Sequence, residues 1–223
     1  MGNIVSPRQL ALALDHAESF AREDFLSGPP NEAALALIDR WPDWPDRMVV
    51  LVGPEGSGKS HLASIWASEV GARALSAHSL THINLPLALA TGALVVDDVA
   101  PESVDERALF HLLNLAREER ASLLLTARSV PAAWTLEIRD LSSRLRVLPV
   151  VSVAPPDDAL LRSLIVKLAA DRQLQVDEGL VSFITARIER SFAGARAAVT
   201  RLDHEAMRQQ RPVTRALAAE LLR

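Results

Sequence analysis

Hydrophobic residues in the central part of the chain follow two alternating patterns. Short apolar runs occupy residues 48–52, 94–98, 122–126 and 148–153, and a further strand is predicted at 73–76. Between these runs, apolar residues recur every three or four positions, as on a helix, over 59–70 and 105–120. Apolar strands separated by helices are typical of a parallel sheet that is buried on both faces. The pattern therefore predicts an α/β core of three layers, with the sheet between two layers of helices.

The last third of the chain shows helical spacing alone. The sequence Pro-Pro-Asp-Asp at 155–158 is a strong helix start, because proline suits the first turn and acidic side chains favour its N-terminal end. Apolar spacing then predicts helices over 159–171, 177–189, 191–207 and 214–222. We therefore predict a core domain over 16–154, followed directly by a small helical lid domain over 155–223. Residues 78–90 are too irregular to assign.

A short arm, residues 1–15, precedes the core. Its apolar positions alternate at Leu10, Leu12 and Leu14, directly after Gln9. One interpretation is a strand that packs on its own domain. The other, which we favour, is a linear motif that inserts into the groove of a partner, with Gln9 as the hydrogen-bonding side chain and the leucines as apolar anchors.

The best-defined motif lies between the first strand and the helix that follows it. Gly53, Gly58, Lys59 and Ser60 complete the Walker A pattern G-x-x-x-x-G-K-[ST]. The pattern binds phosphate after a buried strand and at a helix N-terminus, since it directs backbone N–H groups and a helix dipole at the phosphates. The alternative is that the glycines only turn the chain. We favour phosphate binding, by Gly53, Pro54, Glu55, Gly56, Ser57, Gly58, Lys59, Ser60 and His61.

Two carboxylates end the apolar run at 94–98, which has the form of a Walker B motif. Asp97 would support a Mg²⁺ ion held chiefly by Ser60 and the phosphates, and Asp98 would orient or deprotonate the attacking water. Paired acids at a strand end also occur as helix caps or turn residues. Because ligands of parallel sheets bind at the carboxyl ends of the strands, we expect Thr126, at the end of the run 122–126, to join this site.

Phe20 and Phe25 precede a helix predicted to begin at Asn31 and to end before Trp41. A segment placed just before the Walker A strand is well sited to cover the base of a nucleotide. The other interpretation is ordinary core packing, which we favour for the two phenylalanines.

Composition narrows the remaining function classes. The 223-residue chain has a net charge of −4 and no cysteine, which removes disulfides and thiolate metal sites and is compatible with a cytoplasmic location. No apolar run reaches the roughly 18 residues that a membrane helix needs, so we expect no membrane partner. A mildly acidic chain without a basic run is a poor candidate for autonomous DNA binding, so we expect DNA contact to be indirect or weak.

Together these segments resemble an AAA+ ATPase module and, more narrowly, the nucleotide-binding module of the bacterial replication initiator DnaA. The segments that carry the resemblance are GKSHL at 58–62, LVVDD at 94–98, LFHLLN at 109–114, SSRL at 142–145, APPDDALL at 154–161 and VTRALAAELL at 213–222. The sequence ends at Arg223, so we expect the initiator's C-terminal DNA-binding domain to be absent. A separate module with a QL-x-L-x-L arm resembles the Hda-type regulators that inactivate the initiator.

This resemblance implies two partners and a mechanism. The arm, with Gln9, Leu10, Leu12 and Leu14, matches the motif that binds the replicase sliding clamp. Arg144, in SSRL, matches the arginine-finger position and would stimulate hydrolysis of ATP bound to DnaA. The alternative for Arg144 is a surface or intramolecular ion pair. The implied cofactors are ADP or ATP with Mg²⁺, and a second copy of the chain is a further candidate partner.

Two departures from the family pattern concern the nucleotide sensors. The acid expected after LLLT is replaced by Arg128, and the second sensor arginine falls on Ala193, with Arg190 and Arg196 on either side. We therefore expect a nucleotide binder with weak ATPase activity of its own, acting mainly on a partner ATPase. The competing hypotheses are a helicase-loader-like AAA+ ATPase and a small-molecule P-loop kinase, for which no acceptor site is evident.

Overall fold

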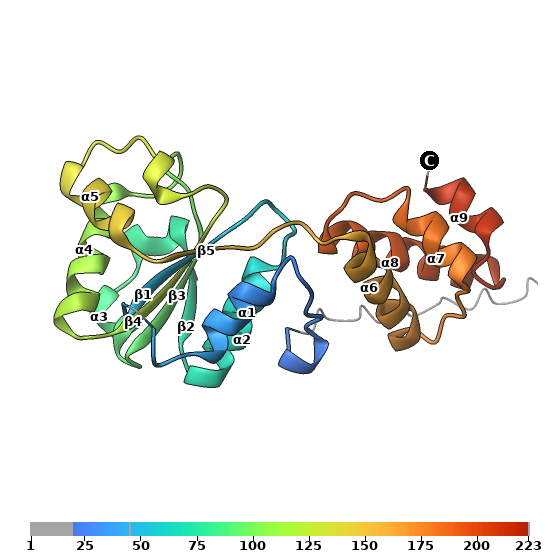
Figure 1. The fold of residues 1–223 in the computed structure, drawn as a ribbon, viewed down its shortest axis with the longest axis horizontal. Coiled ribbons are helices and arrows are strands. Elements are labelled where there is room, and N and C mark those ends of the chain that lie inside the picture. The colour runs from blue at the N-terminus through green and yellow to red at the C-terminus, as the bar shows by residue number, and fades with distance from the viewer. Residues whose placement is uncertain (1–19, 45, 223) are drawn as a thin grey trace, which may run out of the picture.

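Five parallel strands with helices on both faces form the first part of the molecule, and four helices form the second (Figure 1). In this computed structural model, residues 20–44 and 46–222 are described. The predicted arm and its residues Gln9, Leu10, Leu12 and Leu14 lie outside them. Among the described residues, no helix has both the length and the apolar character needed to cross a bilayer.

The strand order of the sheet is β2-β3-β4-β1-β5. The strands are β1 (Met48–Val52), β2 (Arg73–Ser76), β3 (Ala93–Val99), β4 (Ser122–Ala127) and β5 (Val150–Ser152). All four pairings are parallel, with Leu51 opposite Thr126 between β1 and β4 and Val96 opposite Leu125 between β3 and β4. This order brings the ends of β1 and β3 to either side of β4, so the Walker A loop and the two carboxylates flank Thr126. The predicted parallel three-layer core is confirmed.

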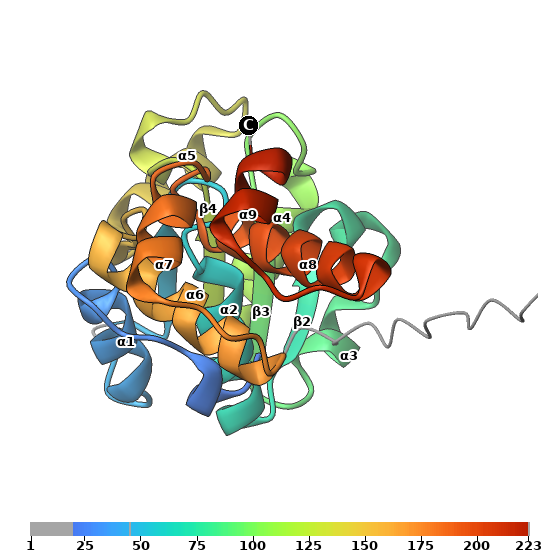
Figure 2. The ribbon, with the colours of Figure 1, turned by 90° about the vertical axis from the view of Figure 1, so that its right-hand side faces the viewer.

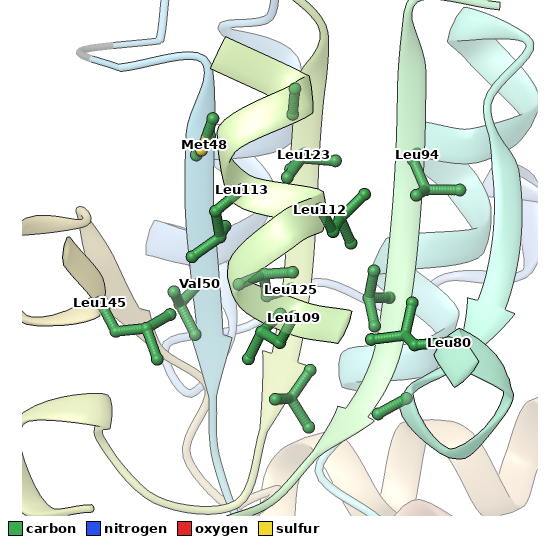
Figure 3. Packing of buried hydrophobic residues seen from close by; sticks show 14 of the residues in the cluster. Met48, Val50, Leu80, Leu94, Leu109, Leu112, Leu113, Leu123, Leu125 and Leu145 are labelled. Atoms are coloured by element: carbon green, nitrogen blue, oxygen red, sulfur yellow. The ribbon is translucent and has the colours of Figure 1, made fainter. Parts of the chain in front are cut away.

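Alternate residues of the central strands pack on opposite helix layers, as the pleat of a sheet requires. Val49, Leu51, Val95 and Leu124 pack with helices α1 (Glu32–Asp39) and α2 (Lys59–Val70). Their neighbours in the strands pack with α3 (Leu85–Leu89), α4 (Glu106–Glu118) and α5 (Arg139–Val147). Figure 3 shows the side chains of this second layer, including Met48, Val50, Leu109, Leu112, Leu113, Leu123, Leu125 and Leu145.

The lid consists of helices α6 (Asp158–Asp171), α7 (Glu178–Thr185), α8 (Phe192–Gln209) and α9 (Arg215–Leu221). It has a hydrophobic cluster of its own, drawn from all four helices. In Figure 2, the lid helices lie in front of the sheet when the molecule is seen from the lid side. Each helix begins at a polar side chain that accepts a hydrogen bond from a backbone N–H, as N-caps do. These residues are Asp157, Asp177, Ser191 and Thr214.

A short 3-10 helix, η1 (Arg22–Asp24), connects the two parts. On the core side, Arg22 contacts Asp39 of α1 at 2.5 Å and Glu69 of α2 at 3.2 Å. On the lid side, Asp24 contacts Lys167 of α6 at 2.5 Å. Two residues of this three-residue segment thus carry ion pairs, Arg22 to the core and Asp24 to the lid, and we refer to Arg22–Asp24 as the strap.

Several element predictions need correction. The helix predicted over 177–189 ends at Thr185, since the chain turns there before Ser191 starts α8. The irregular stretch 78–90 contains η2 (Ala77–His82) and α3, which Asn84 caps by accepting from the N–H of Leu87 at 3.1 Å. The SSRL segment, for which no element was predicted, lies in α5.

Two smaller features complete the core. A further 3-10 turn, η3 (Pro131–Ala133), follows β4. Asn31 does start α1, but its side chain does not cap the helix. Instead its amide accepts from the N–H of Gly28 at 2.9 Å and donates to the carbonyl of Leu26 at 3.0 Å, which fixes the loop that enters the helix.

Candidate nucleotide site

The Walker A loop is held close to the sheet and to the lid, and two of its glycines are required by that proximity. A Cβ atom at Gly53 would lie 2.2 Å from the carbonyl oxygen of Val153, so no other residue fits at the end of β1. Gly56 has a φ of +70°, and a Cβ there would lie 2.7 Å from the Cβ of Ser191 in the lid. The N–H of Phe192 donates to the carbonyl of Gly56 at 2.9 Å. The loop therefore contacts the first turn of α8 directly.

The N-terminus of α2 has the features of a phosphate-binding end. Gly58 is its N-cap residue and supplies no side chain to the first N–H groups, which have no partner within the helix. The ammonium of Lys59 is turned back on the loop and donates to the carbonyl of Pro54 at 2.8 Å. Lys59 is only 8% exposed, and this burial lowers its pKa, although Asp97 and Asp98 oppose the shift. A buried ammonium held by one carbonyl has further donors for phosphate oxygens.

Ser60, Asp97 and Thr126 form one hydrogen-bonded group. The hydroxyl of Ser60 donates to the Asp97 carboxylate, whose oxygens lie 3.1 and 3.2 Å away. Thr126, which is fully buried, donates to Asp97 at 2.5 Å. Its hydroxyl oxygen also accepts from the N–H of Asp98 at 2.9 Å. Thr126 thus contacts the carboxylate of Asp97 and the backbone of Asp98, and it does not line the cavity described below.

A β-bulge separates the roles of the two acids. The register of β3 against β4 shifts between Val96 and Val99, so that Asp97 and Asp98 together oppose Thr126. Asp98 has a φ of +56°, a left-handed conformation that aspartate tolerates better than most residues. Bulges re-aim side chains in this way. Asp97 therefore faces Ser60, whereas the carboxylate of Asp98 meets Arg128 at 3.2 Å.

A cavity of about 220 Å³ lies between the Walker A helix and the lid. The loop and α2 contribute Gly56, Gly58, Lys59, Ser60 and His61 to its wall. The segment before α1 and the lid supply the rest, namely Phe20, Asp24, Phe25, Leu26, Leu164, Phe192, Ala193 and Arg196. The remaining predicted residues Gly53, Pro54, Glu55, Ser57, Asp97 and Asp98 border the site without lining this cavity. The loop end of the cavity is polar, and the rest of the wall is mostly apolar and aromatic, apart from Asp24 and Arg196.

Phe20 and Phe25, which were not predicted as site residues, form the aromatic part of the cavity wall. Phe20 and Phe25 both contact the ring of His61 edge to face, with centroids 5.4 and 5.2 Å apart. His61 is held by the carbonyl of Ala21, 3.2 Å from its Nε2 atom. Core packing was the favoured interpretation for the phenylalanines. Phe25 does pack against a core cluster, and both rings also line the cavity. Their place just before the Walker A strand was the available signal.

Of the three lid residues at or beside the expected second sensor, Ala193 and Arg196 line the cavity and Arg190 does not. Ala193 lines the cavity but carries no charge, and Arg196, one turn later on α8, lines it as well. Arg190 pairs with Asp158 at the start of α6, at 3.0 Å, and is not part of the wall. The i to i+3 spacing between Ala193 and Arg196 could have identified Arg196 from the sequence.

These residues fit a nucleoside di- or triphosphate. The loop glycines, the uncapped helix start and Lys59 suit phosphate groups, and the hydroxyl of Ser57, 1% exposed, has no hydrogen-bond partner of its own. Ser60 and Asp97 fit Mg²⁺, which prefers one or two protein oxygens together with phosphate oxygens. No group of three or more acidic, histidine or cysteine side chains able to hold a metal lies among the described residues, so a metal here would depend on the phosphates.

Arg144 lies elsewhere, on α5 at the end of the core farthest from the lid (Figure 1). Its guanidinium donates to the side-chain oxygen of Asn114 and lies over the ring of Phe110, 4.9 Å from the centroid. Both partners belong to α4 and to the LFHLLN segment. Arg144 is half-buried and does not line the cavity, so it cannot act on a nucleotide bound there.

The sequence and the fold were both compared with those of known proteins. No protein-family model matches the chain. It is 30% identical over 168 residues to the chromosomal replication initiator protein DnaA of Caulobacter sp. (strain K31). This match covers 64% of this chain and 34% of the Caulobacter protein. Domain III of DnaA from Thermotoga maritima superposes with a TM-score of 0.80 at 18% identity, over 91% of this chain and 95% of that one. AMPPCP-bound DnaA from Aquifex aeolicus gives 0.64 at 17% identity, over 84% and 67%.

The fold is that of an AAA+ P-loop module, similar to domain III of DnaA. Within it, the sheet and helices α1 to α5 form the AAA+ core, and α6 to α9 form the lid. The chain spans about a third of the length of the curated relatives that it matches. The comparison therefore concerns the AAA+ part of the initiator alone.

Proposed function

We propose that this protein binds ADP or ATP between its AAA+ core and lid and regulates the initiation of chromosome replication. The cavity supports nucleotide binding through its polar and aromatic ends, with Lys59 and Ser60 at the phosphates and Phe20 and Phe25 at the base. The similarity to DnaA, one of whose structures is described as AMPPCP-bound, supports the same assignment. A bound Mg²⁺ would neutralise phosphate charge, and Ser60 and Asp97 are the residues that would hold it.

The regulatory part of the proposal is carried by one observation, the position of Arg144. A guanidinium that is remote from its own cavity can only reach a γ-phosphate bound by another molecule. Its side chain is fixed by Phe110 and Asn114, and Asn114 takes one of the five N–H donors of the guanidinium. The others remain for phosphate oxygens. Offered to ATP bound by DnaA, Arg144 would stabilise the charge that develops during hydrolysis, an effect worth about 10³–10⁵ in rate.

The sliding clamp of the replicase is the second partner that we propose, through Gln9, Leu10, Leu12 and Leu14. A clamp loaded on DNA would bring the regulator to the initiator without requiring DNA affinity of its own, in keeping with the net charge of −4. Such a regulator would work in the cytoplasm as a mainly non-hydrolysing partner of DnaA.

The proposal is tested by loading purified DnaA with labelled ATP and adding this protein together with DNA-loaded clamp. We expect the wild-type protein to stimulate hydrolysis, and Arg144→Ala to lose at least about 100-fold of the stimulation. A protein with both Gln9 and Leu10 substituted should no longer respond to the clamp, so that adding DNA-loaded clamp does not increase hydrolysis. The matched control is Arg146→Ala, because Arg146 is exposed on the same helix.

Binding of a fluorescent nucleotide to each variant separates the two halves of the proposal. Arg144→Ala should bind nucleotide as the wild type does, since Arg144 is outside the cavity. Hydrolysis of DnaA-bound ATP that does not respond to the wild-type protein would overturn the regulatory role. Equal loss with Arg146→Ala would show that the helix surface, and not one guanidinium, is responsible.

A further inference from the structure

Arg128 joins the two motifs of the nucleotide site. It follows β4 directly, and its Nε donates to Asp98 at 3.2 Å while Nη1 contacts Glu55 of the Walker A loop at 2.9 Å. The hydrogen bond to Asp98, with the negative charge of both acids, raises the pKa of the guanidinium above its usual value. One cation therefore bridges the second Walker B carboxylate and the phosphate-binding loop.

This bridge concerns Asp98 and leaves Asp97 free of it. Asp97 is bonded to Ser60 and Thr126, whereas the bulge and the left-handed backbone direct Asp98 toward Arg128. A general base must face the water that it activates and must be free to accept a proton. The Asp98 carboxylate is instead directed at the Arg128 guanidinium, 3.2 Å away, and in this position it is not placed for that role.

We propose that Arg128 restrains the site, holding Asp98 away from catalysis so that bound ATP is retained and not hydrolysed. This inference rests on the proposed nucleotide binding and adds a reason for weak turnover. When the restraint is removed, Asp98 accepts a proton from the water whose oxygen bonds to the γ-phosphorus. The bond from that phosphorus to the bridging oxygen breaks, and the bridging oxygen keeps the electron pair. Arg128 acts through Asp98 and is a positioning residue.

The opposite role for Arg128 is contact with the γ-phosphate itself. In that case the arginine would contribute to ATP affinity and to turnover, and its loss would weaken both. The two roles predict changes of opposite sign, so one substitution distinguishes them.

The experiment compares ATP turnover by the full chain with Arg128→Asn, Arg128→Lys and Asp98→Asn, alone and combined. We expect Arg128→Asn to raise turnover at least about 10-fold, since a positioned base contributes about 10²–10⁴-fold. Arg128→Lys keeps a cation beside Asp98 and should stay within about 3-fold of the wild type. The double variant Arg128→Asn with Asp98→Asn should return to the wild-type level, because the released carboxylate is absent.

Equilibrium binding of ATP and ADP supplies a readout that does not depend on turnover. We expect Arg128→Asn to change both affinities by less than about 3-fold, because the arginine pairs with protein carboxylates. The matched control is Arg208→Asn, which removes another exposed arginine, 65% accessible against 55% for Arg128, from its pair with Glu205 in the lid. It should change neither turnover nor affinity.

The outcomes separate this inference from the proposed function. If the wild-type protein binds neither nucleotide, nucleotide binding fails and the restraint fails with it. If it binds nucleotide but Arg128→Asn gives no gain in turnover, the restraint alone is overturned. A selective loss of ATP affinity in Arg128→Asn would instead assign the arginine to the γ-phosphate.

Discussion

Asp97 and Asp98 are neighbours in the sequence, yet their side chains have different partners. Asp97 is bonded to Ser60 and Thr126, and Asp98 is paired with Arg128. The cause is a bulge in β3 with a left-handed residue at its end. A strand that ends in two acids is visible in a sequence, but a bulge is set by pairing with β4 and is not. Separate roles for the two acids could be proposed from the sequence, but the pairing of Asp98 with Arg128 could not.

At the same scale, Lys59→Met should stabilise the ligand-free protein while it weakens nucleotide binding. Burial of Lys59 penalises its charged form and lowers its pKa, and methionine fills the same space without charge. We expect a gain on the order of 1 kcal/mol, which is about 2–4 °C in melting temperature. Nucleotide affinity should fall at least about 10-fold with the loss of a charged hydrogen-bond donor.

The sign of this effect can be checked by pH. The folded-state pKa of Lys59 lies below the unfolded value of 10.5, so the penalty is present at neutral pH. It is relieved as the pH rises through the folded value toward the unfolded one. The advantage of methionine should therefore shrink in that alkaline range, as measured by denaturant unfolding. An advantage that grows there would contradict a buried-charge penalty.

The residues of the Walker A loop could be proposed from the sequence because their spacing carries the chemistry. Asp97 was placed beside them from the strand that it ends, and the structure brings it next to Ser60. Phe20, Phe25 and Arg196 were not proposed as site residues because their roles depend on how the lid sits over the core. Contacts between distant segments leave no local pattern in a chain. The arm residues remain a prediction.

Among the elements, the strap Arg22–Asp24 shows how a three-residue segment can connect two larger parts. Arg22 contacts α1 and α2, and Asp24 contacts Lys167 of α6 and lines the cavity. A nucleotide between core and lid would lie beside this link. The angle between core and lid is therefore coupled to the contacts of the strap.

We expect Lys167→Met and Asp24→Asn to weaken nucleotide binding by about 3- to 10-fold, because the lid loses an ion pair to the strap. Asp171→Asn is the matched control, since Asp171 contacts the same ammonium at 3.0 Å from within α6. Equilibrium binding of a fluorescent nucleotide measures all three. If Asp171→Asn weakens binding equally, the loss comes from removing any acidic partner of Lys167, and the contact with the strap has no special role.

The same link has a pH dependence that follows from Lys167. The hydrogen bond that Lys167 donates to Asp24 outweighs partial burial and raises the pKa of Lys167 above 10.5. The stabilisation is therefore fully present below pH 10.5 and is lost as the pH rises through the higher folded value. Nucleotide binding should retain this contribution across the neutral range.

Element boundaries could be predicted where local signals are strong. The proline and aspartates before α6 and the N-caps of α8 and α9 placed those helix starts correctly. The end of α7 at Thr185 carries no glycine or proline, so no local signal marks it. Helix α5 was missed because its polar residues face outward, and only Leu141 and Leu145 are buried.

At the scale of the whole molecule, the core and the lid have separate hydrophobic clusters. They are joined by the strap, the hydrogen bond from Phe192 to Gly56, the chain between β5 and α6, and Leu26, which packs against the lid cluster. Parts with separate clusters open independently more readily than a shared core does. Nucleotide bound between them would add contacts to both.

We therefore expect backbone amides of α6 to α9 to exchange hydrogen faster than those of β1, β3 and β4 in the ligand-free protein. Saturating nucleotide, at about 100 times its dissociation constant, should stabilise the folded state by about 2.7 kcal/mol and slow exchange in the lid. Hydrogen exchange followed by mass spectrometry measures both parts together. Slower exchange confined to the core would contradict binding between core and lid.

The place of Phe20 in the cavity wall limits the reach of everything upstream of it. Leu14 precedes Phe20 by six residues, and six extended residues span at most about 20 Å. A protein that binds the arm at Leu14 must therefore lie within about 20 Å of Phe20 and of the cavity that it lines. A folded protein bound through so short a segment would lie next to the cavity and obstruct access to it. Exchange of nucleotide should therefore be slower while the partner is bound.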